Sequence, residues 1–109
     1  MADYNGIMAS INEINGVSGS AIASAEGAIL ASTLEGAPAE LGESTSQVYS
    51  KIGAQIKRMQ RGTIRRLVLE TEDGITLLSG LAQGELLIVF AKVTDGFNLS
   101  QLIEAASRY

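Results

Sequence analysis

The chain has 109 residues, of which 46% are hydrophobic and 18% are charged, and its net charge is −4. A chain of this length and composition can bury one compact core, so we expect a single domain over residues 1–109. The sequence contains neither cysteine nor histidine, which excludes disulfides, metal sites built on those residues, and Ser-His-Asp or Cys-His catalysis. The acidic balance disfavours nucleic acid and anionic lipid as partners.

Nothing in the sequence indicates export or insertion into a membrane. The N-terminal residues show no cationic stretch followed by an apolar run, and no apolar run reaches the roughly 18 residues of a membrane span. The absence of cysteine fits a reducing compartment. We therefore expect a cytoplasmic protein that needs no metal and no cofactor.

The first part of the chain predicts a helix and a β-hairpin. Five apolar residues recur at helical spacing near the N-terminus: Tyr4, Ile7, Met8, Ile11 and Ile14. Gly16 is expected to end this helix, and Gly19 to continue the break. Residues 20–25 and 28–34 flank Glu26-Gly27, which predicts a hairpin. Alternating alanines give the first strand a face of small side chains, against which a helix can pack closely.

A long amphipathic helix is predicted over residues 38–60, with Pro38 in its first turn and Gly62 at its end. Its apolar stripe is Leu41, Thr45, Val48, Ile52, Ile56 and Met59. A neighbouring stripe contains two glycines, each of which costs a helix about 1 kcal/mol relative to alanine: Gly42, Ser46, Tyr49 and Gly53. These glycines indicate close approach of another backbone, either the chain's own sheet or the same helix of a second copy.

The rest of the chain predicts a three-stranded meander. Strands are expected at residues 66–71, 75–79 and 85–93, with turns at Asp73-Gly74 and Gln83-Gly84. The last of these strands is apolar at nearly every position, which is typical of a central strand covered on both faces.

A final helix follows the meander. Asn98 is expected to cap it, with Gln101 at the capping-box position and Phe97 and Leu102 as a hydrophobic staple. The element order α-β-β-α-β-β-β-α predicts an α/β (α+β) fold. One five-stranded antiparallel sheet would carry helices on both faces.

Two groups of charged residues are candidates for function. Three acids at a strand end, Glu70, Glu72 and Asp73, suggest either a carboxylate hydrolase or a solvated turn. Basic residues gather further upstream: Lys57, Arg58, Arg61, Arg65 and Arg66. They form either a docking patch for an acidic partner, because arginine pairs well with carboxylates, or a helix end whose charge complements the helix dipole. No phosphate-binding loop motif is present, so we expect no nucleotide binding by the chain itself.

The element order and several local motifs resemble the roadblock family, whose fold is related in shape to longin and profilin-like domains. The matching pieces span nearly the whole chain: the N-terminal helix leading into residues 16–21, the Glu26-Gly27 turn, the meander with its Gly74 turn, and the helix entry at residues 95–102. The resemblance implies a homodimer, or a larger assembly, in which the third strand and the second helix pair with their counterparts. On this sequence the interface comprises Gly42, Ser46, Tyr49, Gly53, Arg66, Leu67, Val68, Leu69 and Glu70.

The resemblance also implies a function. Members similar to the gliding-motility regulator MglB bind Ras-like small GTPases as dimers and promote hydrolysis by repositioning the GTPase's own residues. Eukaryotic relatives serve as dynein light chains and scaffold subunits. We therefore expect a regulator of a Ras-like GTPase that is not itself an enzyme, with partner docking by Lys57, Arg58, Arg61 and Arg65. No catalytic residue is assigned, although Arg58 and Arg61 are the arginines to test as fingers.

Two other functions stay open. One is a structural adaptor in a motor, signalling or polarity complex, with no effect on hydrolysis. The other is a small-ligand sensor on the same fold.

Overall fold

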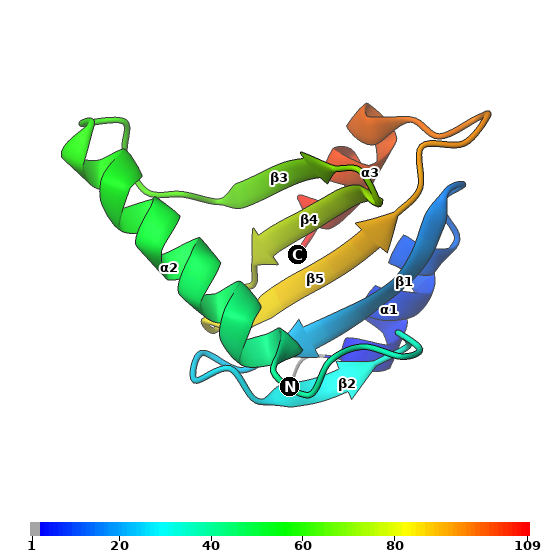
Figure 1. Cartoon of the computed structure of the whole chain (residues 1–109), viewed down its shortest axis with the longest axis horizontal. Helices are drawn as coiled ribbons and strands as arrows, with labels where there is room; N and C mark the ends of the chain where they lie inside the picture. Colours follow the sequence, from blue (N-terminus) through cyan, green and yellow to red (C-terminus); the bar gives the residue numbers. More distant parts are fainter. Residues whose placement is uncertain (1–2) are drawn as a thin grey trace.

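The computed structural model describes residues 3–109; Met1 and Ala2 lie outside the described residues. The elements follow the predicted order α-β-β-α-β-β-β-α (Figure 1). They are α1 (Tyr4–Asn12), β1 (Val17–Ala23), β2 (Ile29–Ser32), α2 (Leu41–Arg58), β3 (Arg66–Thr71), β4 (Gly74–Gly80), β5 (Leu86–Ala91) and α3 (Leu99–Ala106). The predicted fold class is therefore confirmed.

The strands form one antiparallel sheet in the order β2-β1-β5-β4-β3. The apolar strand β5 lies in the middle, as predicted, because a strand with a neighbour on each side and helices on both faces has no side that meets water. Strands β2 and β3 are the two edges, and each pairs with one neighbour among the described strands.

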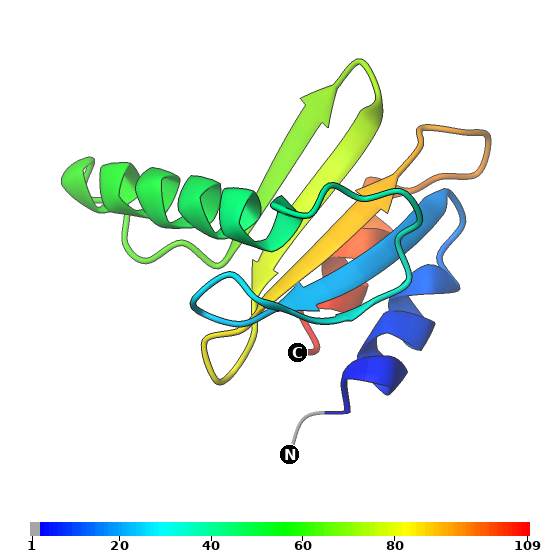
Figure 2. The same cartoon turned by 60° about the horizontal axis from the view of Figure 1, so that its bottom comes forward.

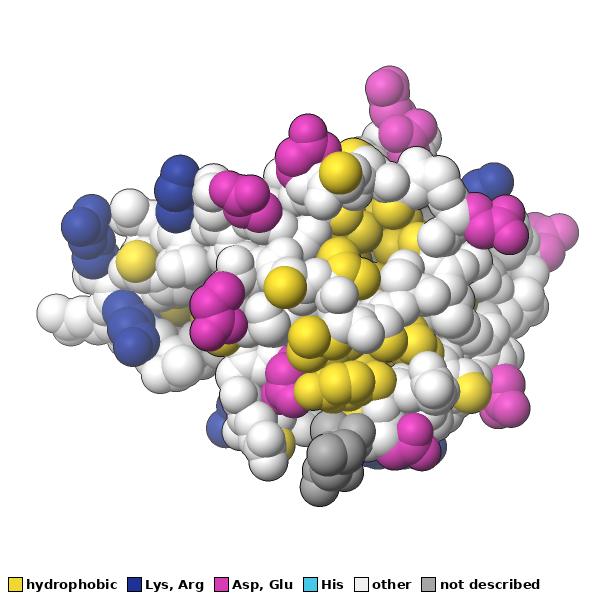
Figure 3. Space-filling model, turned by 90° about the horizontal axis from the view of Figure 1, so that it is seen from below, with side chains coloured by type: hydrophobic (Ala, Val, Ile, Leu, Met, Phe, Trp, Pro, Cys, Tyr) yellow, Lys and Arg dark blue, Asp and Glu magenta, His cyan; other side chains and the backbone are white. Residues whose placement is uncertain are grey.

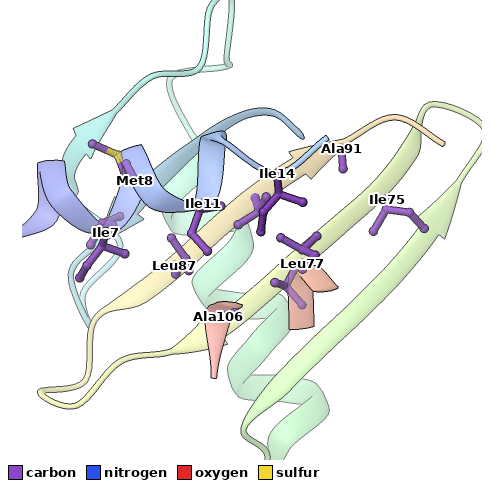
Figure 4. Packing of buried hydrophobic residues seen from close by; sticks show 12 residues of the cluster. Ile7, Met8, Ile11, Ile14, Ile75, Leu77, Leu87, Ala91 and Ala106 are labelled. Atoms are coloured by element: carbon purple, nitrogen blue, oxygen red, sulfur yellow. The ribbon is translucent and has the colours of Figure 1, made fainter. Parts of the chain in front are cut away.

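Helices cover both faces of the sheet, which confirms the predicted arrangement. Helices α1 and α3 enclose the larger core on one face. Figure 4 shows Ile7 and Ile11 of α1 beside Leu87 of β5, and Ala106 of α3 near Leu77 of β4.

Helix α2 lies on the opposite face (Figures 1 and 2) and packs over a smaller core. The alanines Ala21 and Ala23 of β1 are fully buried in this smaller core. The small face predicted for the first strand therefore does receive a helix.

The predicted cap of the last helix is confirmed. The Asn98 side chain accepts a hydrogen bond from the backbone N–H of Gln101 at 3.3 Å. Phe97 and Leu102, the predicted staple pair, both belong to the larger core. At the start of α1, the Asp3 side chain accepts from the Gly6 N–H at 3.0 Å, a cap that satisfies a free N–H in the first turn.

Three predicted boundaries are wrong. Gly62 does not end α2, because the helix ends at Arg58 and Gln60, with a φ of 60°, makes the left-handed turn after it. Gly19 does not continue the break after α1, because Gly16 makes the turn by itself with a φ of 96° and the chain is extended from Val17 onward. Gly19 instead lies inside β1 at a shift of register against β5. Pro38 precedes α2 rather than lying in its first turn, since its carbonyl accepts from the Leu41 N–H at 3.1 Å and closes a turn before the helix begins.

Candidate interaction surface

The described residues hold no group of three or more potential ligands that could bind a metal ion. Glu70, Glu72 and Asp73 are exposed around the β3–β4 turn, where the sequence allowed either a hydrolase or a solvated turn. None of the helices within residues 3–109 combines the length and apolar character that a membrane crossing requires.

The N-terminal end of α2 is held against the β1–β2 hairpin by a contact between two glycines. A Cβ placed on Gly42 would overlap the carbonyl oxygen of Gly27. Gly27 has a φ of 92°, and a Cβ there would come within 2.9 Å of the Cα of Glu43. Backbone therefore meets backbone at this contact, and neither position has room for a side chain.

The same side of α2 packs further along against the segment that leads into β3. A Cβ on Gly53 would lie 2.9 Å from Cγ2 of Ile64. The Tyr49 hydroxyl donates to the carbonyl of Arg65 at 2.9 Å. Burial raises the pKa of this phenol, and the Gly80 backbone and the charge of Arg66 oppose that rise only in part. The phenol thus keeps its proton and stays a donor.

The close packing of the glycine stripe is therefore intramolecular, which was the first of the two alternatives for these glycines. Ser46 and Tyr49 line a solvent-open hollow of about 590 Å³ at the end of the sheet, together with Arg65 and Arg66. Membership of Gly42, Ser46, Tyr49 and Gly53 in a homodimer interface stays a prediction, and the packing of these residues needs no second copy.

The apolar stripe of α2 is buried at its start and uncovered at its end. Leu41 and Thr45 are each 9% exposed, whereas Val48 is 37% and Met59 64% exposed. A helix of 18 residues is about 27 Å long, and Figure 1 shows its C-terminal end extending beyond the sheet. The second half of the stripe therefore has too little of this chain's own sheet beneath it.

The sheet face beside α2 also carries apolar side chains that are incompletely covered. Leu67 of β3 and Phe90 of β5 are half-buried and pack against the smaller core under α2, as does Leu34 in the loop after β2. Leu69 is half-buried too, and it shares a face with Leu67 because residues two apart in a strand point to the same side. The exposed apolar residues of α2 and these side chains lie on the same face of the molecule, and together they are its apolar surface.

That apolar surface ends at β3, the sheet edge predicted for dimerisation. Five of the predicted interface residues lie on this edge strand: Arg66, Leu67, Val68, Leu69 and Glu70. Strand β3 pairs with β4 alone among the described strands, so the backbone groups on its other side are available for a further strand.

The basic residues lie at one end of the molecule. Residues 44–69 hold six of the eight basic residues and none of the twelve acidic ones. All four predicted docking residues are exposed: Lys57 and Arg58 in the last turn of α2, Arg61 after it, and Arg65 just before β3. Figure 3 shows a group of Lys and Arg side chains at the end of the molecule where α2 extends beyond the sheet, and Asp and Glu side chains spread over the rest of that face.

Sequence reasoning named the exposed apolar residues of α2 but did not assign them to an interaction surface. Val48 and Met59 belong to a stripe whose periodicity is the same whether a helix covers its own sheet or a second molecule. The available signal was the length of the helix, which exceeds the roughly 19 Å spanned by five strands at about 4.8 Å spacing.

The Roadblock/LC7 domain model matches residues 6–91 of this chain. A Roadblock/LC7 domain from Streptomyces avermitilis shares the fold with a TM-score of 0.83 at 18% identity, covering 98% of this chain and 91% of its own. The gliding protein MglB from Thermus thermophilus gives 0.78 at 15% identity, covering 99% and 85%, and Myxococcus xanthus MglB gives 0.78 at 13%, covering 99% and 86%. No curated protein matches the chain by sequence. With its fold and most of its length matched, the chain belongs to the Roadblock/LC7 domain family.

Proposed function

We propose that this chain is a single-domain cytoplasmic protein that forms homodimers, binds a Ras-like small GTPase and regulates its GTP hydrolysis without being an enzyme itself. The observation that carries the proposal is the combination of three features around α2 and β3: an uncovered apolar stripe, an unpaired sheet edge and a basic end on an acidic protein. Membership of the Roadblock/LC7 family, whose members are typically regulators or adaptors, and the likeness in fold to MglB support it.

The homodimer is supported by the position of the apolar surface. Clustered exposed apolar side chains mark sites of association, and a two-fold axis lets the same patch serve both copies. If two β3 edges pair antiparallel about an axis perpendicular to the sheet, both α2 helices lie on the same face of a continuous sheet. The overhanging half of each helix then lies over the other copy, where it covers apolar residues such as Leu69 and Phe90.

The basic end of α2 is proposed as the GTPase docking site. Replacing Arg58 and Arg61 together by glutamate should abolish binding of the GTPase while the dimer and the melting temperature stay unchanged, because both residues are exposed. Wild-type binding should also weaken as salt is added, since long-range attraction between charges is screened. Calorimetric titration of the GTP-loaded GTPase at two salt concentrations measures both effects.

The matched control is Lys92→Glu with Arg108→Glu, which changes the net charge equally at two exposed positions outside the basic end. This control should bind like the wild type. Equal loss of binding in both double variants would mean that net charge matters and the position of the charges does not. A lower melting temperature in the double variant of Arg58 and Arg61 would show instead that these charges stabilise the end of the helix.

The regulatory role is tested by single-turnover GTP hydrolysis with a purified Ras-like GTPase from the same genome. Saturating amounts of this protein should raise the rate at least tenfold. Arg58→Ala and Arg61→Ala should need more protein for half-maximal effect but reach the same maximal rate. A fall of the maximal rate to near the intrinsic rate of the GTPase would identify an arginine finger.

The structural adaptor remains the second candidate, favoured by the same surfaces because docking alone does not require any effect on hydrolysis. It makes a different prediction in the same assay. The GTPase would bind and would depend on Arg58 and Arg61, while its hydrolysis rate stayed at the intrinsic value.

A further inference from the structure

The unpaired side of β3 presents a defined set of backbone groups. The N–H of Gly80 donates to the carbonyl of Arg65 at 3.0 Å, and Arg66 is paired with Ser79 in the register of β3 and β4. Along an antiparallel strand the residues whose backbone groups face a given neighbour alternate. Residues 65, 67, 69 and 71 therefore face β4, and Arg66, Val68 and Glu70 direct their N–H and C=O groups outward.

This alternation restricts how a second β3 can pair with the first. A shift by one residue would set an inward-facing residue against an outward-facing one, and the ladder of hydrogen bonds would be lost. A shift by two residues from the register that sets Val68 opposite Val68 of the second copy would leave one of the three outward-facing residues without a partner inside the strand. Only the register with Val68 opposite Val68 of the second copy pairs all three.

The same register brings opposite charges together. With Val68 on the two-fold axis, Arg66 lies directly opposite Glu70 of the second copy, and the symmetry repeats this pair at the other end. On the α2 side of the sheet, Leu67 then lies opposite Leu69 of the second copy, which continues the apolar surface across the junction. Directly opposed residues of opposite charge stabilise an antiparallel pair, and like charges destabilise it.

We infer that Arg66 and Glu70 are the residues that determine with which chain this protein pairs, by fixing the β3–β3 register with Val68 at the two-fold axis. The inference rests on the proposed homodimer and specifies its geometry. Pairing with a β3 edge that lacked this arrangement of charges would leave Arg66 and Glu70 of this chain opposite the wrong groups. The sequence of one short strand thus selects a second copy of itself.

The test uses two variants whose homodimers are destabilised by like charges and whose mixed dimer is stabilised by opposite charges. In Arg66→Glu both cross-strand pairs become Glu–Glu, and in Glu70→Arg both become Arg–Arg. Each variant by itself should dimerise at least tenfold more weakly than the wild type. When the two are mixed with different mass tags, every cross-strand pair is Glu–Arg, so native mass spectrometry should find more than 90% of the dimers mixed instead of the statistical half. The preference should decline with salt.

Two further variants separate this inference from simpler explanations. The double variant Arg66→Glu with Glu70→Arg restores both pairs with exchanged charges, so it should dimerise like the wild type but exclude wild-type chains. Glu72→Arg makes the same charge change as Glu70→Arg on the exposed turn beyond β3, and it should show no preference for Arg66→Glu. If these two variants stay dimeric, then the weaker dimers of Arg66→Glu and Glu70→Arg do not result from unfolding of the protomer.

Statistical mixing of Arg66→Glu with Glu70→Arg, both still dimeric, would overturn the register and leave the homodimer standing. A wild-type protein that is monomeric at tens of micromolar by light scattering would overturn the homodimer itself, and the register with it.

Discussion

Replacing Gly42 by alanine is expected to lower the free energy of unfolding by about 3 kcal/mol. The added Cβ would overlap the carbonyl oxygen of Gly27. Backbone atoms cannot rotate away as a side chain can, so either the hairpin or the start of α2 must move. Urea unfolding followed by circular dichroism measures the change.

Gly53→Ala is the matched control, because it makes the same substitution in the same helix. Its Cβ would meet Cγ2 of Ile64 at 2.9 Å, which is a side-chain methyl group that can shift. The helix also gains about 1 kcal/mol from alanine over glycine. We therefore expect a change within about 1 kcal/mol of zero. Equal and small effects at both positions would show that the contact between Gly42 and Gly27 does not hold the hairpin on the helix.

Replacing Val48 by aspartate should weaken the homodimer at least 100-fold while leaving the protomer folded. Val48 is 37% exposed in the protomer, so a charge there meets water before association. In the proposed dimer the same side chain is covered by the second copy, and an unpaired carboxylate must then lose its hydration. Analytical ultracentrifugation gives the dissociation constant, and thermal melting of the diluted monomer reports its stability.

Gln47→Asp supplies the control for this substitution. Gln47 is the preceding residue of α2 and is exposed, and one step along a helix turns the side chain by about 100° away from the apolar stripe. The two variants add the same charge at neighbouring positions of the same helix. A dimer weakened equally by both would place the interface elsewhere, and a dimer unaffected by either would remove the apolar stripe from it.

The elements of this protein and their order can be read from its amino-acid sequence. Helical spacing in residues 4–14 and the continuous apolar run of β5 predicted a helix and a central strand, and both are present. The cap by Asn98 was equally readable, because a cap depends on residues three apart in the chain. The boundaries at Gly19 and Pro38 were wrong, since a glycine or a proline near a turn fits several positions of that turn equally well.

Which neighbour each side of α2 meets is visible only in the folded chain. Gly42 and Gly53 are equally good sites for the chain's own backbone and for a second helix, and the contact with Gly27 spans two elements that are distant along the chain. The register of β3 against β4 was likewise needed to learn that Arg66, Val68 and Glu70 face outward. The spacing of apolar residues along a chain indicates that a residue is buried or paired. The identity of what covers it is set by long-range packing, which only the folded chain contains.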